Sequence, residues 1–453
     1  MSELSPNSIE DLITNGEIDT VLVVFPNLQG IPVGKRVEGE FYLKHVRSKG
    51  IEACDYLLTV DIALNPLKGF EFANWETGYG DMLALPDENT LRLVPWLEKT
   101  AFVICDLYDH SKNPIEVAPR WILKNQIKKI QEVNLDVMAA SELEFFLFNE
   151  TQKSVKSKEY KNLETFSDAI QDYQIYETTK EEFLIRFIRN NMKSAGIPIE
   201  FSKGEAGRGQ HEINITYSDA LTAADNHLFF KNGVKEIAAL KNLTVTFMAK
   251  YNANEVGSSC HIHSSLWNKS TNNSEMTGDI FNRLSNVAAS YIEGIIQTTK
   301  DFMILYAPNV NSYKRFRASS WAPTSVSWGF DNRTATHRLV GSGDSLRIES
   351  RVAGADCNPY LALAGIIAGG LYGIQNSLKL REPVKGNAYN LPSDLKLPES
   401  LLEATHCFLN SKVANQSFGE RVQKHLANMA YQEWHSFIAT VTDWELLRYF
   451  ERT

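Results

Sequence analysis

Short apolar runs separated by turn residues dominate the first quarter of the chain. They are VLVVF at 21–25, IPVGKRV at 31–37, DMLALP at 81–86, LRLVPW at 91–96 and AFVICDL at 101–107. Runs of this length, bounded by turns such as the one predicted from Asn27 to Gly30, are typical of β-strands. The pattern therefore predicts a small strand-rich domain over residues 1–110.

After Pro114 the pattern changes to longer segments with helical spacing of apolar residues. APRWILKNQIKKIQEV at 118–133, EEFLIRFIRNNMKSAG at 181–196 and HLFFKNGVKEIAAL at 227–240 repeat apolar positions three and four residues apart, and strands alternate with them. This pattern predicts a larger α+β domain over residues 111–453. The polar segments 149–172 and 271–279 are expected to form exposed loops.

The most apolar uncharged segment is NPYLALAGIIAGGLYGI, residues 358–374. It is short for a bilayer span, and its small residues favour close packing against a neighbouring element. The segment therefore predicts a buried helix and no membrane span.

Four of the predicted strands carry a polar face whose side chains could bind a ligand or take part in a reaction. Because residues two apart in a strand project from the same side, each strand presents one alternating set to one face. The sets are Glu142 and Glu144 in SELEFFLF (141–148), Glu212 in GQHEINI (209–215) with Glu205 just upstream, His261, His263 and Ser265 in SSCHIHSSLW (258–267), and Arg347, Glu349 and Arg351 in SLRIESRVA (345–353).

Each of these faces, taken alone, has an ordinary structural explanation. Paired carboxylates are usually solvated, two histidines are more often satisfied side chains than ligands, and an Arg-Glu-Arg row is commonly a surface ion-pair row. Together, however, five carboxylates and a histidine would repel one another unless cations neutralised them. The recurrence of the pattern therefore suggests hard divalent metals.

The type of ligand limits which metal could bind and which reaction it could support. Carboxylate oxygens with little histidine and no thiolate suit Mg²⁺ or Mn²⁺ better than zinc, and arginines bind phosphate and carboxylate groups through their planar forks. Metal with arginine suggests phosphoryl transfer. The chain has no GxxxxGK[ST] loop and no dinucleotide-binding GxGxxG in a strand context, so any nucleotide must be held by a different scaffold.

The composition of the chain excludes several classes of partner and site but does not identify the function. The 453 residues carry 46 Lys and Arg against 55 Asp and Glu, a formal net charge of -9, which disfavours nucleic-acid and anionic-membrane partners. Five scattered cysteines without CxxC spacing indicate neither a disulfide framework nor a thiolate zinc site. The N-terminal MSELSPNSIEDLI is not typical of a signal peptide, so a cytoplasmic setting is expected.

Seven stretches, in this order, resemble glutamine synthetase and its relatives, the γ-glutamyl amine ligases. They are SELEFFLF, EAGRGQHEINI, GSSCHIHSSLW, NSYKRFR, APTSVSWGFDNRTATHR, RIESRVAGADCNPYLALAGIIAG and VTDWELLRYFE, and they span nearly the whole chain. The resemblance implies a β-grasp-like domain over 1–110 and a catalytic domain over 111–453 whose curved antiparallel sheet forms a two-mouthed tunnel.

The resemblance also implies an assembly and a reaction. The assembly is a homo-oligomeric ring, typically a dodecamer of two hexamers, with active sites at subunit boundaries. The C-terminal WELLRYFERT is then an inter-ring contact, or alternatively an ordinary amphipathic helix. The reaction uses ATP, L-glutamate, an amine and two or more Mg²⁺ or Mn²⁺ ions per active site.

The resemblance assigns roles position by position. Glu144, Glu205 and Glu212 would bind the metal that orients glutamate, and Glu142, His261 and Glu349 the metal that bridges the ATP phosphates. Gly257, Arg315 and Arg351 would hold glutamate, Arg333 would stabilise the transferred phosphoryl group, and His263, Ser265, Arg338 and Arg347 would contact ATP. Arg333, Glu212 and Arg315 are the expected catalytic residues. Tyr389, in NAYNLP, matches a loop tyrosine that is adenylylated in some bacterial relatives, and an exposed turn tyrosine is the favoured alternative.

The chain departs from true glutamine synthetases where ammonium is received. The flap RASSWAPT (317–324) places Trp321 at the position of a glutamate, the segment 70–87 lacks the DGSS-type motif, and Val256 replaces an asparagine. An indole offers apolar area where a compact cation prefers carboxylates, so a larger, partly apolar amine is expected. The alternatives are that Trp321 is only flap packing and Glu76 receives ammonium, that the chain is a non-catalytic homologue, or, more remotely, that it is a guanidino kinase.

Overall fold

The computed structural model describes residues 6–453; the first five residues of the N-terminal segment that was judged not to be a signal peptide lie outside the described residues. Its N-terminal part is a five-stranded sheet in the order β2-β1-β5-β4-β3, with β1 and β5 parallel at its centre. The strands are β1 (Thr20–Pro26), β2 (Pro32–Glu38), β3 (Ile51–Cys54), β4 (Asp81–Leu93) and β5 (Thr100–Tyr108). Short helices α1 (Pro6–Thr14), α2 (Gly39–Phe41) and α3 (Arg47–Lys49) accompany them.

The predicted strands of this part are confirmed, with one correction. DMLALP and LRLVPW were expected as separate runs, but the single strand β4 includes all of DMLALP and the first three residues of LRLVPW, Leu91–Leu93. The pairing of β4 with β5 shifts register between Asp87 and Arg92, so an irregular stretch interrupts the ladder without ending the strand.

The larger sheet runs through residues 135–350 in the order β13-β14-β15-β11-β6-β8-β7, with β9 and β10 added against β6. It is antiparallel except for the β13–β14 pair. Its strands are β6 (Leu135–Phe148), β7 (Ile199–Gly204), β8 (Gln210–Ile215), β9 (Ser218–Asp219), β10 (Thr244–Thr246), β11 (Cys260–Asn268), β13 (Trp328–Phe330), β14 (His337–Val340) and β15 (Arg347–Ser350); β12 (Thr277–Ile280) lies apart. The predicted α+β class is confirmed.

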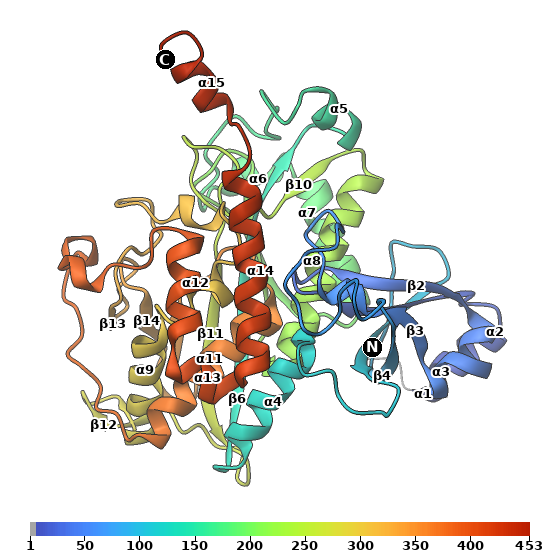
Figure 1. The fold of residues 1–453 in the computed structure, drawn as a ribbon, viewed down its shortest axis with the longest axis horizontal. Helices are drawn as coiled ribbons and strands as arrows, with labels where there is room; N and C mark the ends of the chain where they lie inside the picture. The colour runs from blue at the N-terminus through green and yellow to red at the C-terminus, as the bar shows by residue number, and fades with distance from the viewer. Residues whose placement is uncertain (1–5) are drawn as a thin grey trace.

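Helices flank this sheet (Figure 1). They are α4 (Pro119–Gln131), α5 (Gln152–Ser157), α6 (Ile175–Thr179), α7 (Glu182–Ser194), α8 (Ala220–Leu240), α9 (Asn286–Thr298), α10 (Met303–Tyr306), α11 (Pro359–Gln375), α12 (Leu401–Asn410), α13 (Lys412–Phe418), α14 (Glu420–Ile438) and α15 (Asp443–Tyr449). The predicted helices correspond to α4, α7, α8 and α11. Helix α5 interrupts the expected loop 149–172, because the Thr151 side chain caps it by accepting from the Ser154 amide.

The apolar segment 358–374 forms the buried helix α11, which packs on α9 through glycines. A Cβ on Gly294 would lie 2.2 Å from the Gly369 carbonyl oxygen, and one on Gly373 would lie 2.0 Å from the Ser290 oxygen. Only glycine permits this approach of the two backbones. Over residues 6–453, no helix has the length and apolarity that crossing a membrane demands.

A buried charge cluster joins the N-terminal sheet to helices of the larger part. Arg120, at the start of α4, donates to Asp106 on β5 at 2.6 Å, to Asp87 on β4 at 2.8 Å and to Asp225 on α8 at 2.8 Å. The Tyr360 hydroxyl of α11 also donates to Asp225, at 2.6 Å. The guanidinium therefore connects the N-terminal sheet to α4 and α8, and Asp225 extends the cluster to α11.

Candidate active site

Strand register gathers the predicted polar faces on one side of the larger sheet. Directly paired residues in an antiparallel ladder project from the same face. The pairs are Glu142 with His261, Glu144 with Glu212, and His263 with Glu349. Residues from four separate stretches of sequence thus become neighbours.

Two groups of these side chains bring their ligand atoms close enough to share an ion. One group is Glu142, His261 and Glu349, and the other is Glu144, Glu212 and His261. Within each group the ligand atoms lie within 4.8 Å of one another. The first group is the set expected for the ATP-side metal.

Burial and mutual repulsion mark Glu144 and Glu212 as carboxylates that need a cation. Glu212 is 5% exposed, and burial, with the charges of Glu142, Glu205 and Glu144, raises its pKa to about 9. Burial and the Glu205 charge raise the pKa of Glu144 to about 7. Both carboxyls would ionise readily beside a bound divalent cation, so the donor set fits such an ion.

The other group is already poised in its ionised form. Burial alone would raise the pKa of Glu142, but His263 and His261 hold it well below its usual range. The pKa of Glu349 is about 2, because His261 and Arg351 outweigh the effect of burial. Burial, with the Arg351 charge, lowers the pKa of His261 to about 4, so its imidazole is neutral and free to ligate near neutral pH.

Glu205 is the one expected ligand outside both groups. Its carboxylate accepts a short hydrogen bond from the Lys203 ammonium, which comes from the neighbouring strand β7. Asp172 lies 3.5 Å from the same ammonium. A lysine thus occupies the place of a cation beside Glu205, and sequence reasoning assigned Lys203 no role.

The polar face opens into a cavity of about 460 Å³. Its lining includes the expected residues Glu142, Glu144, Glu205, Glu212, Gly257, His261, Arg315, Trp321, Arg333, Arg338 and Arg351. Apolar and aromatic side chains share the wall, namely Tyr173, Phe201, Val256 and Ala322. The cavity thus combines carboxylates, arginines and apolar surface.

Two arginines of this cavity are deeply buried and incompletely satisfied. Arg315 and Arg351 are each 3% exposed. Arg351 donates to Glu349 at 2.6 Å, and Arg315 donates to the Val352 carbonyl at 2.5 Å. The Nε atoms of both arginines have no hydrogen-bond partner among the described residues. Unpaired donors of buried arginines fit an anionic substrate group such as a carboxylate.

A second cavity, of about 840 Å³, adjoins the first at Arg333 and Arg338, which line both. Arg338 donates to Glu349 at 2.9 Å, whereas Arg333 is exposed and forms no ion pair with residues 6–453. An unpaired arginine between two cavities is suited to a mobile anionic group that passes between two bound substrates.

Of the residues expected to contact ATP, three line neither cavity. Arg347 donates from Nε to His263 Nδ1 at 3.0 Å, and His263 Nε2 lies 2.8 Å from a Glu142 oxygen. Ser265 follows two residues further along β11, where its hydroxyl accepts from Trp267 at 3.0 Å. His263 and Arg347 therefore lie beside the first metal group, whereas Ser265 lies further along β11, opposite Met138.

Glu76 lies apart from the site. It is an exposed residue of the N-terminal segment 70–80 and does not line the catalytic cavity of its own chain.

The flap holds Trp321 in an unusual backbone conformation. Trp321 has φ +64° and Ser319 has φ +62°, in the left-handed region that bulky residues rarely adopt. The Trp321 side chain is 60% exposed at the cavity, and its carbonyl accepts from Arg351 at 3.4 Å. Strain of this kind is commonly retained where it positions a functional group.

The expectation that Tyr389 is an exposed turn tyrosine is wrong. Tyr389 lies in a helical turn, Ala388–Asn390, half-buried, with its hydroxyl oxygen enclosed. Burial raises the pKa of this hydroxyl, and the Arg351 and Arg315 charges act against the rise. The side chain is therefore directed toward the arginines of the cavity.

Sequence reasoning also missed two residues that fix Glu144. Ser259 donates to it from its hydroxyl at 2.5 Å and from its amide at 2.8 Å. Gln210 donates to the same carboxylate at 3.2 Å and to the Gly257 carbonyl at 3.1 Å. Their positions on the polar faces of β8 and at the start of β11 were the available signal.

Comparisons with known proteins agree with this geometry. The family described as glutamine synthetase, catalytic domain, matches residues 116–449. The chain is 43% identical to a gamma-glutamylethanolamide synthetase of Streptomyces coelicolor, covering 99% of this chain and 96% of that protein. It is 37% identical to a glutamate–isopropylamine ligase of a Pseudomonas species, covering 98% and 97%. The solved structure of GmaS without ligand superposes with a TM-score of 0.85 at 26% identity over 99% of both chains.

Proposed function

This chain belongs to the glutamine synthetase family, and from that premise we propose that it condenses L-glutamate with a partly apolar amine larger than ammonia. The products are a γ-glutamyl amide, ADP and phosphate. The expected enzyme class, a glutamate–amine ligase, is confirmed by its relatives, which include gamma-glutamylethanolamide and glutamate–isopropylamine ligases.

One observation carries the choice of a larger amine. The catalytic cavity presents Trp321 from its flap, with Val256 and Phe201 on the walls. An indole and two apolar side chains remove an alkyl group from water, whereas a bare ammonium ion gains nothing from them except a cation–π contact.

The chemistry proceeds in two displacements. A γ-carboxylate oxygen of glutamate attacks the γ-phosphorus of ATP, the bond to ADP breaks, and an acyl phosphate forms. The amine, after loss of its proton, attacks the acyl carbon, and phosphate leaves with the former carboxylate oxygen. We assign Gly257, Arg315 and Arg351 to glutamate and Arg333 to the transferred phosphoryl group. We also assign His263, Ser265, Arg338 and Arg347 to ATP.

The metal-binding residues in this proposal are the sequence-predicted sets. Glu144, Glu205 and Glu212 would hold one Mg²⁺ or Mn²⁺, and Glu142, His261 and Glu349 another. Bound divalent cations neutralise phosphate charge and orient the reacting oxygens. For Glu205 to join, its ion pair with Lys203 must open, which would free the Lys203 ammonium to face the substrate.

Assembly and setting complete the proposal. The C-terminal helix α15 projects from the rest of the chain (Figure 1) and exposes large apolar side chains. These are Trp444, Leu446 and Leu447, and Phe450 directly after the helix is exposed as well. We propose that this segment makes contacts between rings of a cytoplasmic homo-oligomer in which Glu76 reaches the active site of a neighbouring subunit.

A panel of amines tests the proposed reaction. We expect phosphate release with glutamate, ATP and Mg²⁺ to show a kcat/KM for the best of ethanolamine, isopropylamine and putrescine at least about tenfold above that for ammonium, since a few buried methylenes are worth 1–3 kcal/mol. Mass spectrometry of the γ-glutamyl product confirms the bond formed.

Two results contradict this expectation. Equal or higher kcat/KM with ammonium indicates an authentic glutamine synthetase. Absence of turnover with every amine, while ATP still binds, indicates a non-catalytic homologue.

Trp321→Ala tests the origin of amine preference. We expect kcat/KM for the preferred amine to fall about 10- to 100-fold, because the apolar area offered by the indole is lost, and that for ammonium to change by less than about threefold. Trp321→Phe should retain most of the activity. The control is Tyr217→Ala, an exposed aromatic residue that does not line the catalytic cavity. An equal loss for ammonium and the larger amine would show that the flap only excludes water.

A further inference from the structure

Lys203 lies on the wall of the catalytic cavity, between two carboxylates. It comes from β7, and its Nζ donates a short hydrogen bond to Glu205 and lies 3.5 Å from an Asp172 oxygen. The same Nζ lies 4.4 Å from the centroid of the Tyr173 ring. Among the described residues, Lys203 is the only cationic side chain that forms an ion pair with Glu205 or with Asp172. One ammonium group is therefore shared by two acids and an aromatic ring.

Lys203 keeps its positive charge in this position. Burial lowers its pKa, but the charge and hydrogen bond of Glu205, and then the charge of Glu212, outweigh burial and raise the pKa above its ordinary value. The side chains of Lys203 and Glu205 are 18% and 14% exposed, so solvent screens the pair only in part. Lys203 therefore neutralises part of the carboxylate cluster in the place of a metal ion.

Asp172 is anchored beside β7, so the second partner of Lys203 is fixed in place. The Asp172 backbone forms a parallel bridge with Gly204, the residue after Lys203. A Cβ on Gly204 would lie 2.5 Å from the Gln171 Cβ, so only glycine lets the segment lie this close to the strand. The Gln171 side chain is buried, and its Nε2 donates to Glu181 at 2.7 Å. Asp172 therefore offers Lys203 an alternative carboxylate within a short reach.

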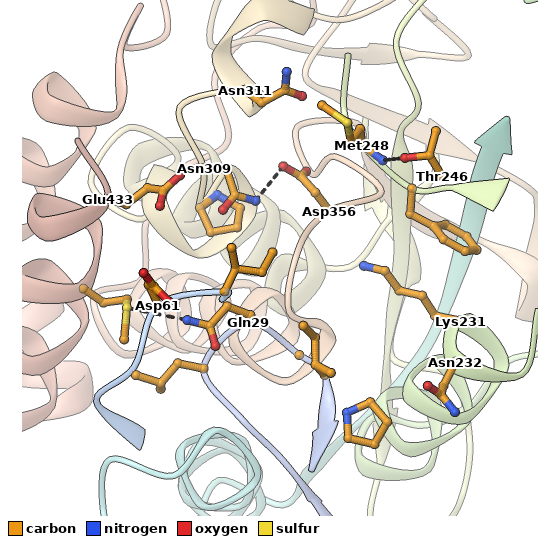
Figure 2. Close-up of a pocket in the computed structure, with 18 of the residues that line it drawn as sticks. Gln29, Asp61, Lys231, Asn232, Thr246, Met248, Asn309, Asn311, Asp356 and Glu433 are labelled. Atoms are coloured by element: carbon orange, nitrogen blue, oxygen red, sulfur yellow. Dashed lines mark hydrogen bonds between the residues drawn. The ribbon is translucent and has the colours of Figure 1, made fainter. Parts of the chain in front are cut away.

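A second buried lysine shows the contrasting arrangement. Lys231 lines a separate cavity of about 590 Å³ between the N-terminal part and the larger part (Figure 2). Its Nζ donates to the carbonyls of Ala355 at 2.6 Å and Cys357 at 3.4 Å, and it forms no ion pair with residues 6–453. An ammonium held by backbone carbonyls has no second acid to move to, whereas Lys203 has one 3.5 Å away.

We propose that Lys203 is a positioning residue that exchanges carboxylates when the active site takes up a divalent cation. In the structure its ammonium holds Glu205. When Glu205 ligates a metal ion with its neighbouring carboxylates, the Lys203 ammonium passes to Asp172, which also lines the cavity. Lys203 therefore opposes metal binding, and Asp172 favours it. This inference rests on the assignment of Glu205 as a metal ligand in the proposed function.

The exchange predicts effects of opposite sign on metal affinity for Lys203 and Asp172. Loss of Lys203 removes a cation that competes for Glu205, so a divalent cation should bind more tightly. Loss of the Asp172 charge leaves Lys203 with Glu205 as its one acid, so the metal should bind more weakly. The Asp172 effect should vanish once Lys203 is absent, because it acts through that ammonium.

Binding of Mn²⁺ to the metal-free full-length protein, followed by electron paramagnetic resonance of the free ion, tests the exchange. We expect Lys203→Met to tighten one class of bound Mn²⁺ at least about tenfold, since a hydrogen bond between charged groups no longer has to open, and to change any other class by less than about threefold. Asp172→Asn should weaken the same class at least about threefold. In Lys203→Met combined with Asp172→Asn, the affinity should lie within about twofold of that of Lys203→Met alone.

Two variants separate this exchange from a general change of charge. Lys193→Met removes the same charge at an exposed position of α7 outside the catalytic cavity, and it should bind Mn²⁺ as the wild type does. Lys203→Arg keeps a cation beside Glu205 and should bind Mn²⁺ no more tightly than the wild type. Because Asp172 is exposed, Asp172→Asn tests the proposal even if Lys203→Met does not fold.

The proposal is overturned if Mn²⁺ affinity in Lys203→Met is unchanged or lower, or if Lys193→Met tightens binding equally. It is also overturned if Asp172→Asn does not weaken binding, or weakens it equally in the absence of Lys203. If the wild type binds no Mn²⁺, both this inference and the metal assignment of the proposed function are wrong, whereas Mn²⁺ binding that does not respond to Lys203 contradicts this inference alone. The measurement requires no turnover, so failure of the amine panel leaves it intact.

Discussion

Glu212→Gln is expected to lower kcat for glutamate–amine ligation by about 10³-fold, the scale on which removal of a preorganised charge contact from an active site acts. The substitution keeps the shape of the side chain. Among the described residues the Glu212 carboxylate has no hydrogen-bond donor to lose, and its pKa of about 9 makes it largely protonated near neutral pH in the absence of metal. Glutamine is then a close mimic of the metal-free state.

This reasoning separates a metal ligand from a structural residue. Metal-free wild-type protein should gain thermal stability when Mg²⁺ or Mn²⁺ is added, because a cation relieves the repulsion among Glu142, Glu144 and Glu212. The variant should unfold at the same temperature as metal-free wild type, or slightly higher, and should gain much less from added metal. Differential scanning fluorimetry with and without a chelator measures both quantities.

Glu200→Gln is the matched control. Glu200 is exposed on β7, the strand that pairs with β8, and does not line the catalytic cavity. It should retain activity and metal response. Wild-type turnover by Glu212→Gln would remove the metal assignment, and a large loss of stability without metal would show that Glu212 has a structural role instead.

Local alternation in the sequence was sufficient to predict the composition of the polar faces. The period of two in SELEFFLF places Glu142 and Glu144 on one side, and β6 has that geometry. Cross-strand register is different, because nothing within GQHEINI specifies that Glu212 pairs with Glu144 and not with Glu142. The resemblance to a family supplied that information, and the residues themselves did not.

The features that the sequence did not predict have a shared physical cause. The Lys203 ion pair with Glu205 and the inward direction of Tyr389 depend on how separate segments pack, which periodicity does not encode. The same holds for β4, where two apolar runs were separated by polar residues that proved to belong to an irregular part of one strand. Glu76, which we propose reaches the active site of a neighbouring subunit, illustrates a further limit, since such a residue would have no partner in its own chain.

Arg120→Met is expected to destabilise the fold by about 3–5 kcal/mol, the cost of removing one partner from a buried ionic cluster. The Arg120 side chain is 3% exposed, and its loss leaves Asp87, Asp106 and Asp225 facing one another without their shared guanidinium. Lys124 remains near two of these carboxylates but does not reach Asp225 among its ion pairs. Because the cluster connects β4, β5, α4 and α8, the variant should also loosen the contact between the N-terminal sheet and these two helices.

The loss of stability in Arg120→Met should depend on pH, which distinguishes a lost charge interaction from a simple packing defect. Burial would raise the pKa of Asp87, but Arg120 holds it below its usual value. A carboxyl with a lowered folded-state pKa stabilises the fold above its unfolded pKa and loses that contribution as pH falls through the folded value. The difference in the free energy of unfolding between wild type and Arg120→Met should therefore be largest near neutral pH. It should decrease below about pH 4, the ordinary pKa of an aspartate.

Thermal unfolding of wild type and variants at several pH values measures the effect, with a fall in melting temperature of roughly 5–10 °C expected near neutral pH. Arg120→Lys keeps the charge but loses the planar fork. Its melting temperature should lie between those of wild type and Arg120→Met, because the three donors of an ammonium group share one nitrogen and cannot reproduce the four hydrogen bonds that the guanidinium spreads over three carboxylates. Arg186→Met, at an exposed position of α7, should have the same melting temperature as the wild type. If Arg120→Met and Arg186→Met melted at the same temperature, the charges of the cluster would be balanced by Lys124 and solvent, and the guanidinium would not be what connects the N-terminal sheet to α4 and α8.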